Sequence, residues 1–159
     1  MNTAPEVIIA VHSPDELVAR AVEEHGWWDA DHETHLIPIE AIGVQGGGPS
    51  EQADATQLLE LHDAGVIGFG EAIDMPIDRI DGTVQGELRA DALTWYLNRD
   101  PSSDLTWDDE VSFYGADGPL AIETHDGRLV ILDGCHWYVA AKLRCDETIR
   151  VQVLRRPAV

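Results

Sequence analysis

Residues 128–143 read Arg-Leu-Val-Ile-Leu-Asp-Gly-Cys-His-Trp-Tyr-Val-Ala-Ala-Lys-Leu, and they carry the clearest structural pattern of the chain. The segment begins with a short apolar run that is typical of a buried strand, and Asp133-Gly134 then marks a turn. After the turn, Val139, Ala140 and Leu143 fall on one face of a helix. The segment therefore predicts a strand, a glycine turn and a helix in direct succession.

A second apolar run lies just before this segment. Residues 119–123 read Pro-Leu-Ala-Ile-Glu, and His125-Asp126-Gly127 separates them from residues 128–132. Asp-Gly between two apolar runs is a strong signal for a β-hairpin. We therefore expect two adjacent antiparallel strands here, and a final strand over residues 148–154 after the helix.

The amino-terminal part of the chain begins with a strand and a helix. Residues 6–11 form an apolar run that predicts a short buried strand. Ser13 and Glu16 make a capping box for a helix over residues 14–25. Gly26 is placed to end that helix in the left-handed conformation.

The next segments continue the alternation of strands and helices. Residues 36–42 alternate like a strand, residues 46–49 break it, and Ser50 can cap a helix that ends near Gly65. Residues 66–70 fit either a third strand or a turn that contains glycine. We therefore predict a β-α-β-α lobe over residues 1–73.

A second unit is expected over residues 74–159. It opens with a short strand over residues 75–80, a turn over residues 82–86 and a helix over residues 88–97, before the hairpin, the glycine turn and the last helix and strand. The predicted fold class is α/β of the mixed α+β kind, with a small mixed sheet and helices that follow the amino-terminal lobe.

Composition favours a small protein of the cytoplasm. The chain has 159 residues, of which 44% are hydrophobic, enough for one domain with a lobe attached. It contains no apolar run of the ~20 residues needed to cross a bilayer, and its start does not resemble a signal peptide. Two cysteines are too few for a disulfide framework, so we expect reduced thiols.

The net charge of −20 is distributed unevenly. Residues 1–127 carry 27 of the 30 acidic side chains but four of the ten basic ones. Such a surface disfavours duplex DNA and anionic membranes. It fits a solvated acidic face, a salt-adapted host proteome, or an acidic surface that docks on a basic partner. The presence of nine arginines and one lysine suggests a GC-rich genome, such as that of an actinobacterium, one of its phages or a haloarchaeon.

Residues 134–141, Gly-Cys-His-Trp-Tyr-Val-Ala-Ala, are similar to the Gly-Cys-His-Arg-Tyr-Ala-Ala signature of sulfiredoxins, and Glu-Thr-Ile at residues 147–149 is similar to a later sulfiredoxin motif. Asp133-Gly134 resembles the Asp-Gly-His-His-Arg motif of free serine kinases. Pro-Ile-Asp-Arg-Ile at residues 76–80 resembles the opening strand of ParB. Residues 75–154 thus resemble the ParB/sulfiredoxin superfamily of ParB-like nuclease and sulfiredoxin-like domains.

This resemblance implies a nucleotide-binding protein, either an NTP-dependent phosphotransferase or an NTPase, that uses ATP or CTP with magnesium. The residues implied in chemistry are Cys135, His136 and Asp133; those implied in nucleotide binding are Gly134, Cys135, His136, Arg79 and Arg128. Independent physical reasons support such a site, because the first N–H groups of a helix favour phosphate and stabilise a thiolate. No metal ligands of the protein's own are expected.

An alternative follows from Trp137, which stands where sulfiredoxins and serine kinases have a phosphate-binding arginine. In that alternative, the chain is a catalytically silent ParB-like scaffold of phage or mobile-element type, whose acidic surface binds a protein partner. Cys135 is then a small buried hydrophobe and His136 a satisfied core residue. Two other patterns are better explained as loops. The segment with His32 and His35 has the residue types of a metal cluster, but we favour a solvated loop. Residues 43–48 resemble a phosphate loop, but no lysine follows them, so we favour a flexible connector.

Overall fold

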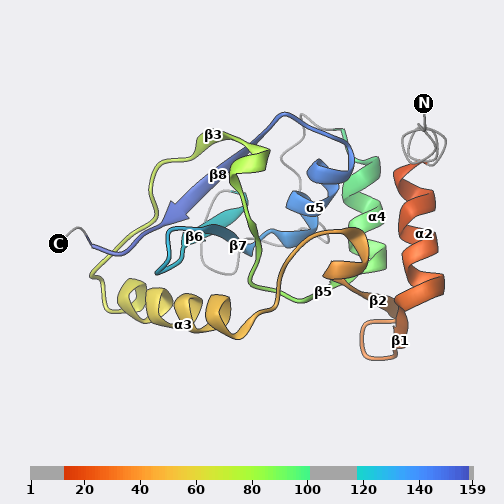
Figure 1. The fold of residues 1–159 in the computed structure, drawn as a ribbon, viewed down its shortest axis with the longest axis horizontal. Helices are drawn as coiled ribbons and strands as arrows, with labels where there is room; N and C mark the ends of the chain where they lie inside the picture. Colours follow the sequence, from red (N-terminus) through yellow and green to blue (C-terminus); the bar gives the residue numbers. More distant parts are fainter. Residues whose placement is uncertain (1–12, 101–117, 158–159) are drawn as a thin grey trace.

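The computed structural model describes residues 13–100 and 118–157, so the strand predicted over residues 6–11 lies outside the described residues. Within these ranges the protein has a mixed α+β fold with four α-helices, a three-stranded sheet and a five-stranded sheet (Figure 1). The predicted fold class is therefore confirmed.

The larger sheet is built mainly from the carboxy-terminal part of the chain. Its strand order is β3-β8-β6-β7-β4. The hairpin strands β6 and β7 pair antiparallel as predicted, whereas β6 with β8 and β7 with β4 pair in parallel. The strands are β3 (Ile73–Pro76), β4 (Gly82–Thr83), β6 (Leu120–Glu123), β7 (Leu129–Asp133) and β8 (Thr148–Leu154).

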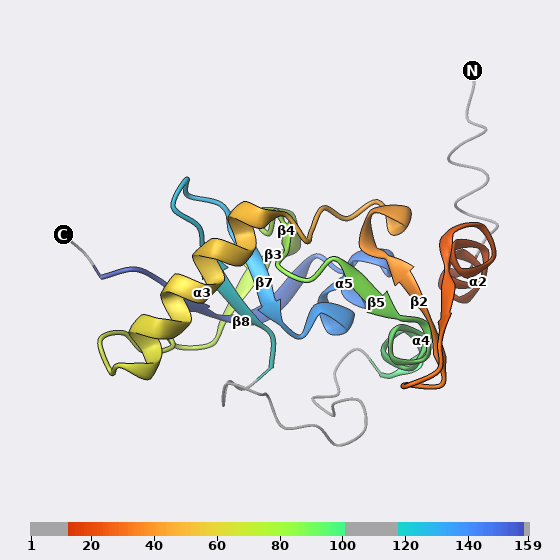
Figure 2. The same ribbon diagram turned by 90° about the horizontal axis from the view of Figure 1, so that it is seen from below.

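Alternate residues of these strands face two separate clusters of buried side chains. In β7, Ile131 joins the larger cluster, which includes residues of helix α5 (Cys135–Leu143). Its neighbour Val130 joins the smaller cluster with residues of helix α3 (Pro49–Asp63). Because side chains of a strand alternate between its faces, α3 and α5 cover opposite faces of the sheet (Figure 2).

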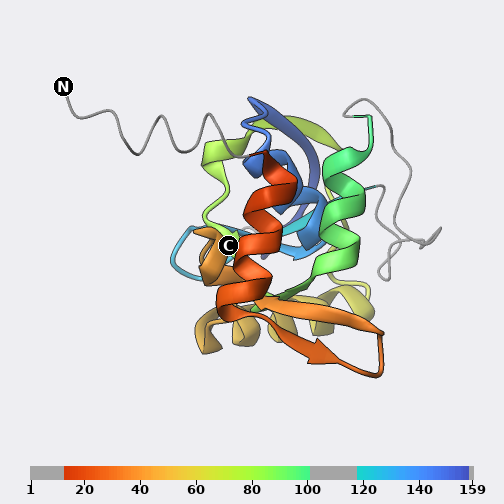
Figure 3. The same cartoon turned by 90° about the vertical axis from the view of Figure 1, so that its right-hand side faces the viewer.

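The smaller sheet lies against two further helices, α2 (Pro14–His25) and α4 (Ala90–Asn98). Its order is β1-β2-β5, and all of its pairs are antiparallel; the strands are β1 (Trp27–Asp29), β2 (Thr34–Pro38) and β5 (Glu87–Arg89). Figure 3 shows α2 and α4 side by side, with the β1–β2 hairpin across their lower ends. Ser13 caps α2 as predicted: its Oγ accepts a hydrogen bond from the N–H of Glu16 at 3.2 Å.

Several predicted boundaries were wrong. Gly26 has an extended backbone, with φ −81°, because the chain passes straight into β1. A larger residue does not fit at this position, since a Cβ would lie 2.8 Å from the carbonyl oxygen of Val22. Helix α3 starts at Pro49 with Gly48 as its N-cap, so Ser50 does not cap it.

The predicted strands were also too long. The strand expected over residues 36–42 gives way after Pro38 to the 3-10 helix η1 (Ile39–Ile42), and the one expected over residues 75–80 gives way after Pro76 to η2 (Ile77–Arg79). A proline lacks the N–H that would extend the pairing. Residues 66–70 form no strand.

One hydrophobic core crosses the predicted boundary at residue 73. Val18 and Ile37, from the amino-terminal side, belong to the same buried cluster as Leu93 and Tyr138. Strand β2 also pairs with β5. Division into units 1–73 and 74–159 stays a prediction. Among the described helices, none has the length and apolar character required to span a membrane.

Candidate functional site

The turn between β7 and α5 contains most of the predicted site residues. Gly134 has φ +85°, a left-handed conformation, and a Cβ there would lie 2.9 Å from the Cα of Pro119. Only glycine meets both conditions without strain. Asp133, at the end of β7, accepts a hydrogen bond through Oδ1 from the N–H of Gly134 at 3.1 Å. The turn thus brings Asp133, Gly134, Cys135 and His136 together, as the sequence predicted.

Cys135 opens α5 and points into the core. Its side chain is 3% exposed, and Sγ lies 3.9 Å from the carbonyl oxygen of Ile131. Burial, together with a smaller effect of the nearby Asp133 carboxylate, raises the pKa of the Cys135 thiol to about 12. At neutral pH the sulfur is therefore a protonated thiol, which is a poor nucleophile.

His136 serves as a hydrogen-bond acceptor. Its Nε2 accepts the backbone N–H of Arg89 at 2.8 Å, at the junction of β5 and α4. Burial, together with a smaller effect of the Arg89 guanidinium, lowers the pKa of His136 to about 4. The imidazole is consequently neutral at pH 7, with its Nε2 lone pair committed to a backbone group. This contact joins α5 to the start of α4.

Trp137 packs into an aromatic cluster with residues of α4. Its ring stacks on Tyr96, with centroids 6.0 Å apart and an angle of 28° between the planes. The guanidinium of Arg99 lies 4.1 Å from the centroid of Trp137 and 4.9 Å from that of Tyr96. An arginine from elsewhere in the chain thus lies over the ring of Trp137.

The two predicted phosphate-binding arginines lie away from this turn. Arg128 precedes β7 and Gly134 follows it, so the five-residue strand separates them by roughly 17 Å. Arg79 ends η2, just before Asp81, whose N–H bonds to the carbonyl of Leu129 at that same far end. The structure therefore does not bring Arg79 or Arg128 to the helix start.

Arg128 has carboxylate partners instead. Its Nη1 lies 2.7 Å from Oε1 of Glu51, and its Nε lies 3.1 Å from Oδ2 of Asp126. The hydrogen bond from Arg128 lowers the pKa of the Glu51 carboxyl below its ordinary value. Through this ion pair, Arg128 ties the hairpin to the first turn of α3.

Sequence reasoning missed Arg89 and Arg99, two arginines that contact the first turn of α5. Arg89 pairs with Asp91 through Nη2 at 3.0 Å, and its backbone meets His136. No local spacing indicates either contact, because each joins residues about forty or more positions apart in the chain. The one local signal is the start of a helix at Ala90, because the first N–H groups of a helix have no partner within it and need a nearby hydrogen-bond acceptor.

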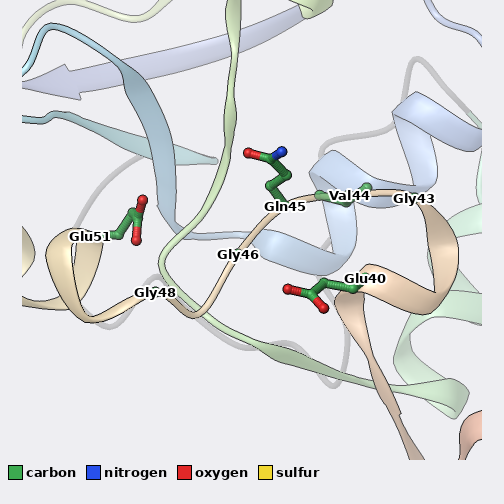
Figure 4. Close-up of a pocket in the computed structure, with 7 residues that line it drawn as sticks. All are labelled: Glu40, Gly43, Val44, Gln45, Gly46, Gly48 and Glu51. Carbon is green, nitrogen blue, oxygen red and sulfur yellow. The ribbon is translucent and has the colours of Figure 1, made fainter.

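The glycine-rich loop borders a pocket of about 500 Å³. Figure 4 shows Glu40 from η1 and Glu51 from α3 on either side of this loop. Neither lysine nor arginine lines this pocket, in the part of the chain that the structure describes. Gly46 is explained by packing, because a Cβ there would lie 2.7 Å from the carbonyl oxygen of Gln85. Among the described residues, the charged side chains that line the pocket are Glu40 and Glu51, and the nearby Arg128 is bound to Glu51, so the pocket offers phosphate no basic partner.

The histidine-rich loop contains one close pair. Nδ1 of His32 lies 2.6 Å from Oδ2 of Asp29 in the β1–β2 connection. Residues 13–100 and 118–157 hold no group of three or more side chains arranged to bind a metal ion.

Comparisons with protein-family models, curated proteins and solved structures find no match to this chain.

Proposed function

We propose that this protein is a catalytically silent scaffold of the ParB/sulfiredoxin-like kind, which binds a protein partner through its acidic surface. The observation that carries the proposal is the state of Cys135 and His136. The first is a buried thiol with its pKa raised to about 12, and the second is a neutral imidazole bound to the N–H of Arg89. Both side chains stabilise the fold, and neither the thiol nor the imidazole is available to react with a substrate.

The order of elements supports the superfamily part of this proposal. From β3 to β8, the chain has the opening strand, helix, hairpin, glycine turn, helix and last strand that the resemblance implies, with η2, β4 and β5 added between the opening strand and the first helix. Trp137 with Arg99 over its ring occupies the position of the missing phosphate-binding arginine. The net charge of −20 favours a basic macromolecular partner over a nucleotide triphosphate.

Binding of a nucleotide phosphate is the second candidate, favoured by one observation. No side chain caps the first turn of α5, so its N–H groups could meet an anion. However, the carboxylate of Asp133 already lies at this turn, bound to the N–H of Gly134. A bound phosphate would be repelled by that charge, and Arg79 and Arg128 are not there to offset it.

Calorimetric titration with ATP and with CTP, each with magnesium, distinguishes these two functions. We expect no saturable binding tighter than about 1 mM, and no release of phosphate on longer incubation. A micromolar dissociation constant that His136→Ala weakens would contradict the silent scaffold. The matched control is His25→Ala, which removes an exposed histidine of α2 far from the turn.

A further inference from the structure

An apolar groove of about 790 Å³ runs between α2 and α4, away from the turn described above. Its α2 wall repeats at helical spacing, with Asp15, Val18, Ala19 and Val22. Its α4 wall contains the side chains of Ala90, Asp91, Thr94, Trp95 and Asn98. The middle of the groove is thus formed by small apolar side chains and the edge of an indole ring.

The charged residues of the groove lie at its two ends. The helices are antiparallel, as Figure 3 shows, so Asp15 near the start of α2 lies beside Asn98 at the end of α4. The side chain of Asn98 donates to Asp15 Oδ1 at 3.1 Å. Asp91 lies at the opposite end, near the start of α4. Among the described lining residues, both charged groups are carboxylates.

Two exposed tryptophans follow α2 in the chain, and as neighbours in a strand they point to opposite faces of the smaller sheet. Trp27 and Trp28 follow α2 directly in β1, the edge strand of the smaller sheet, and they are 43% and 58% exposed. Exposed aromatic side chains are available to contact a partner, and aromatic residues often dominate the energy of an interface.

We propose that this groove between α2 and α4 is the docking site for an amphipathic helix of a partner protein, with a lysine or arginine at the end of its contact that meets Asp15. This inference rests on the proposed function as a binding protein. The nine residues of α4 extend about 14 Å, which matches roughly three turns of a partner helix. Three or four apolar side chains would then contact the middle of the groove, and one basic residue would meet Asp15, since Asp91 is already paired with Arg89.

Charge complementarity selects this occupant over a second copy of the chain. A second copy would bring the same carboxylates to the interface and a net charge of −20. Like charges that meet across an interface oppose association, whereas a basic helix is attracted from a distance and held in register by Asp15.

The test uses the full-length protein and a synthetic peptide of about 14 residues, with leucines at i, i+3, i+4 and i+7 and lysines elsewhere. Binding is measured by calorimetry at ~0.15 M salt, which screens diffuse attraction. Ala19→Arg fills the groove and repels the lysines, so we expect it to weaken binding by at least about tenfold. A peptide with glutamates in place of the lysines should not bind.

Ala53→Arg is the matched control, because it adds the same side chain to an exposed position of α3, on the far side of the sheet (Figure 2). It should change the affinity by less than about twofold. If the two variants lost equal affinity for the peptide, or if the unchanged protein did not bind it, the proposal that the groove is a docking site would be wrong. Neither result changes the outcome of the nucleotide titration. The docking proposal and the proposed function as a silent scaffold can therefore fail independently of each other.

Discussion

Acid pH should destabilise this protein through His136. The pKa of this histidine is lowered from 6.5 to about 4 in the fold, so between these values the unfolded chain binds a proton that the folded chain does not. The contribution of His136 to the free energy of unfolding is therefore complete above pH 6.5 and is lost as the pH falls toward 4. With about 1.4 kcal/mol for each pH unit of difference, the loss is about 2 kcal/mol at pH 5 and about 3 kcal/mol at pH 4.

Urea unfolding of the unchanged protein and of His136→Gln, followed by circular dichroism between pH 7 and pH 4, measures this effect. A glutamine oxygen can still accept the N–H of Arg89 but does not titrate in this range. We expect the free energy of unfolding to fall more steeply in the unchanged protein, by about 3 kcal/mol over the range.

Carboxylates titrate in both proteins, so their effects cancel in the difference. The control His25→Gln, which changes an exposed histidine, should follow the unchanged protein. The reasoning would be refuted if His136→Gln kept the full pH dependence, because His136 would then bind protons as readily in the fold as in the unfolded chain.

Three further substitutions test contacts and backbone positions that stabilise the fold, each by thermal and urea unfolding. Gly134→Ala should cost about 2–4 kcal/mol from the left-handed backbone and the close Pro119, whereas Gly68→Ala, in open space, should stay within about 0.5 kcal/mol. Asp54→Asn should cost about 1.5–3 kcal/mol, because this buried carboxylate joins a hairpin histidine to an arginine after β8. Arg99→Gln should cost about 1–2 kcal/mol and change the tryptophan fluorescence; unaltered stability would argue against the cation–π contact.

Local patterns predicted the elements whose signals lie in neighbouring residues. The capping box at Ser13 placed the start of α2, and Asp126-Gly127 placed the β6–β7 hairpin. Strand β8 was predicted with its observed limits, and the glycine turn before α5 was also correct. Each of these depends on contacts between residues close in the chain, which local spacing can indicate.

Contacts between distant segments could not be predicted in this way. Strand β5 pairs with β2, and the two-residue β4 pairs with β7, and neither short segment has a strand pattern of its own. The same limit applies to the site. The resemblance placed Cys135 and His136 at a helix start, but the burial of the thiol depends on how α5 packs on the sheet. The acceptor role of His136 depends on where β5 ends.

The two cysteines permit the most direct test of the silent site. Alkylation by iodoacetamide of the native protein at pH 8, followed by peptide mass spectrometry, compares the buried Cys135 with the exposed Cys145 in one sample. With its pKa raised to about 12, Cys135 should react at least about 100-fold more slowly than Cys145, and the difference should disappear in urea. A Cys135 that reacts as fast as Cys145 in the folded protein would show an available thiolate at the helix start and would contradict the silent scaffold.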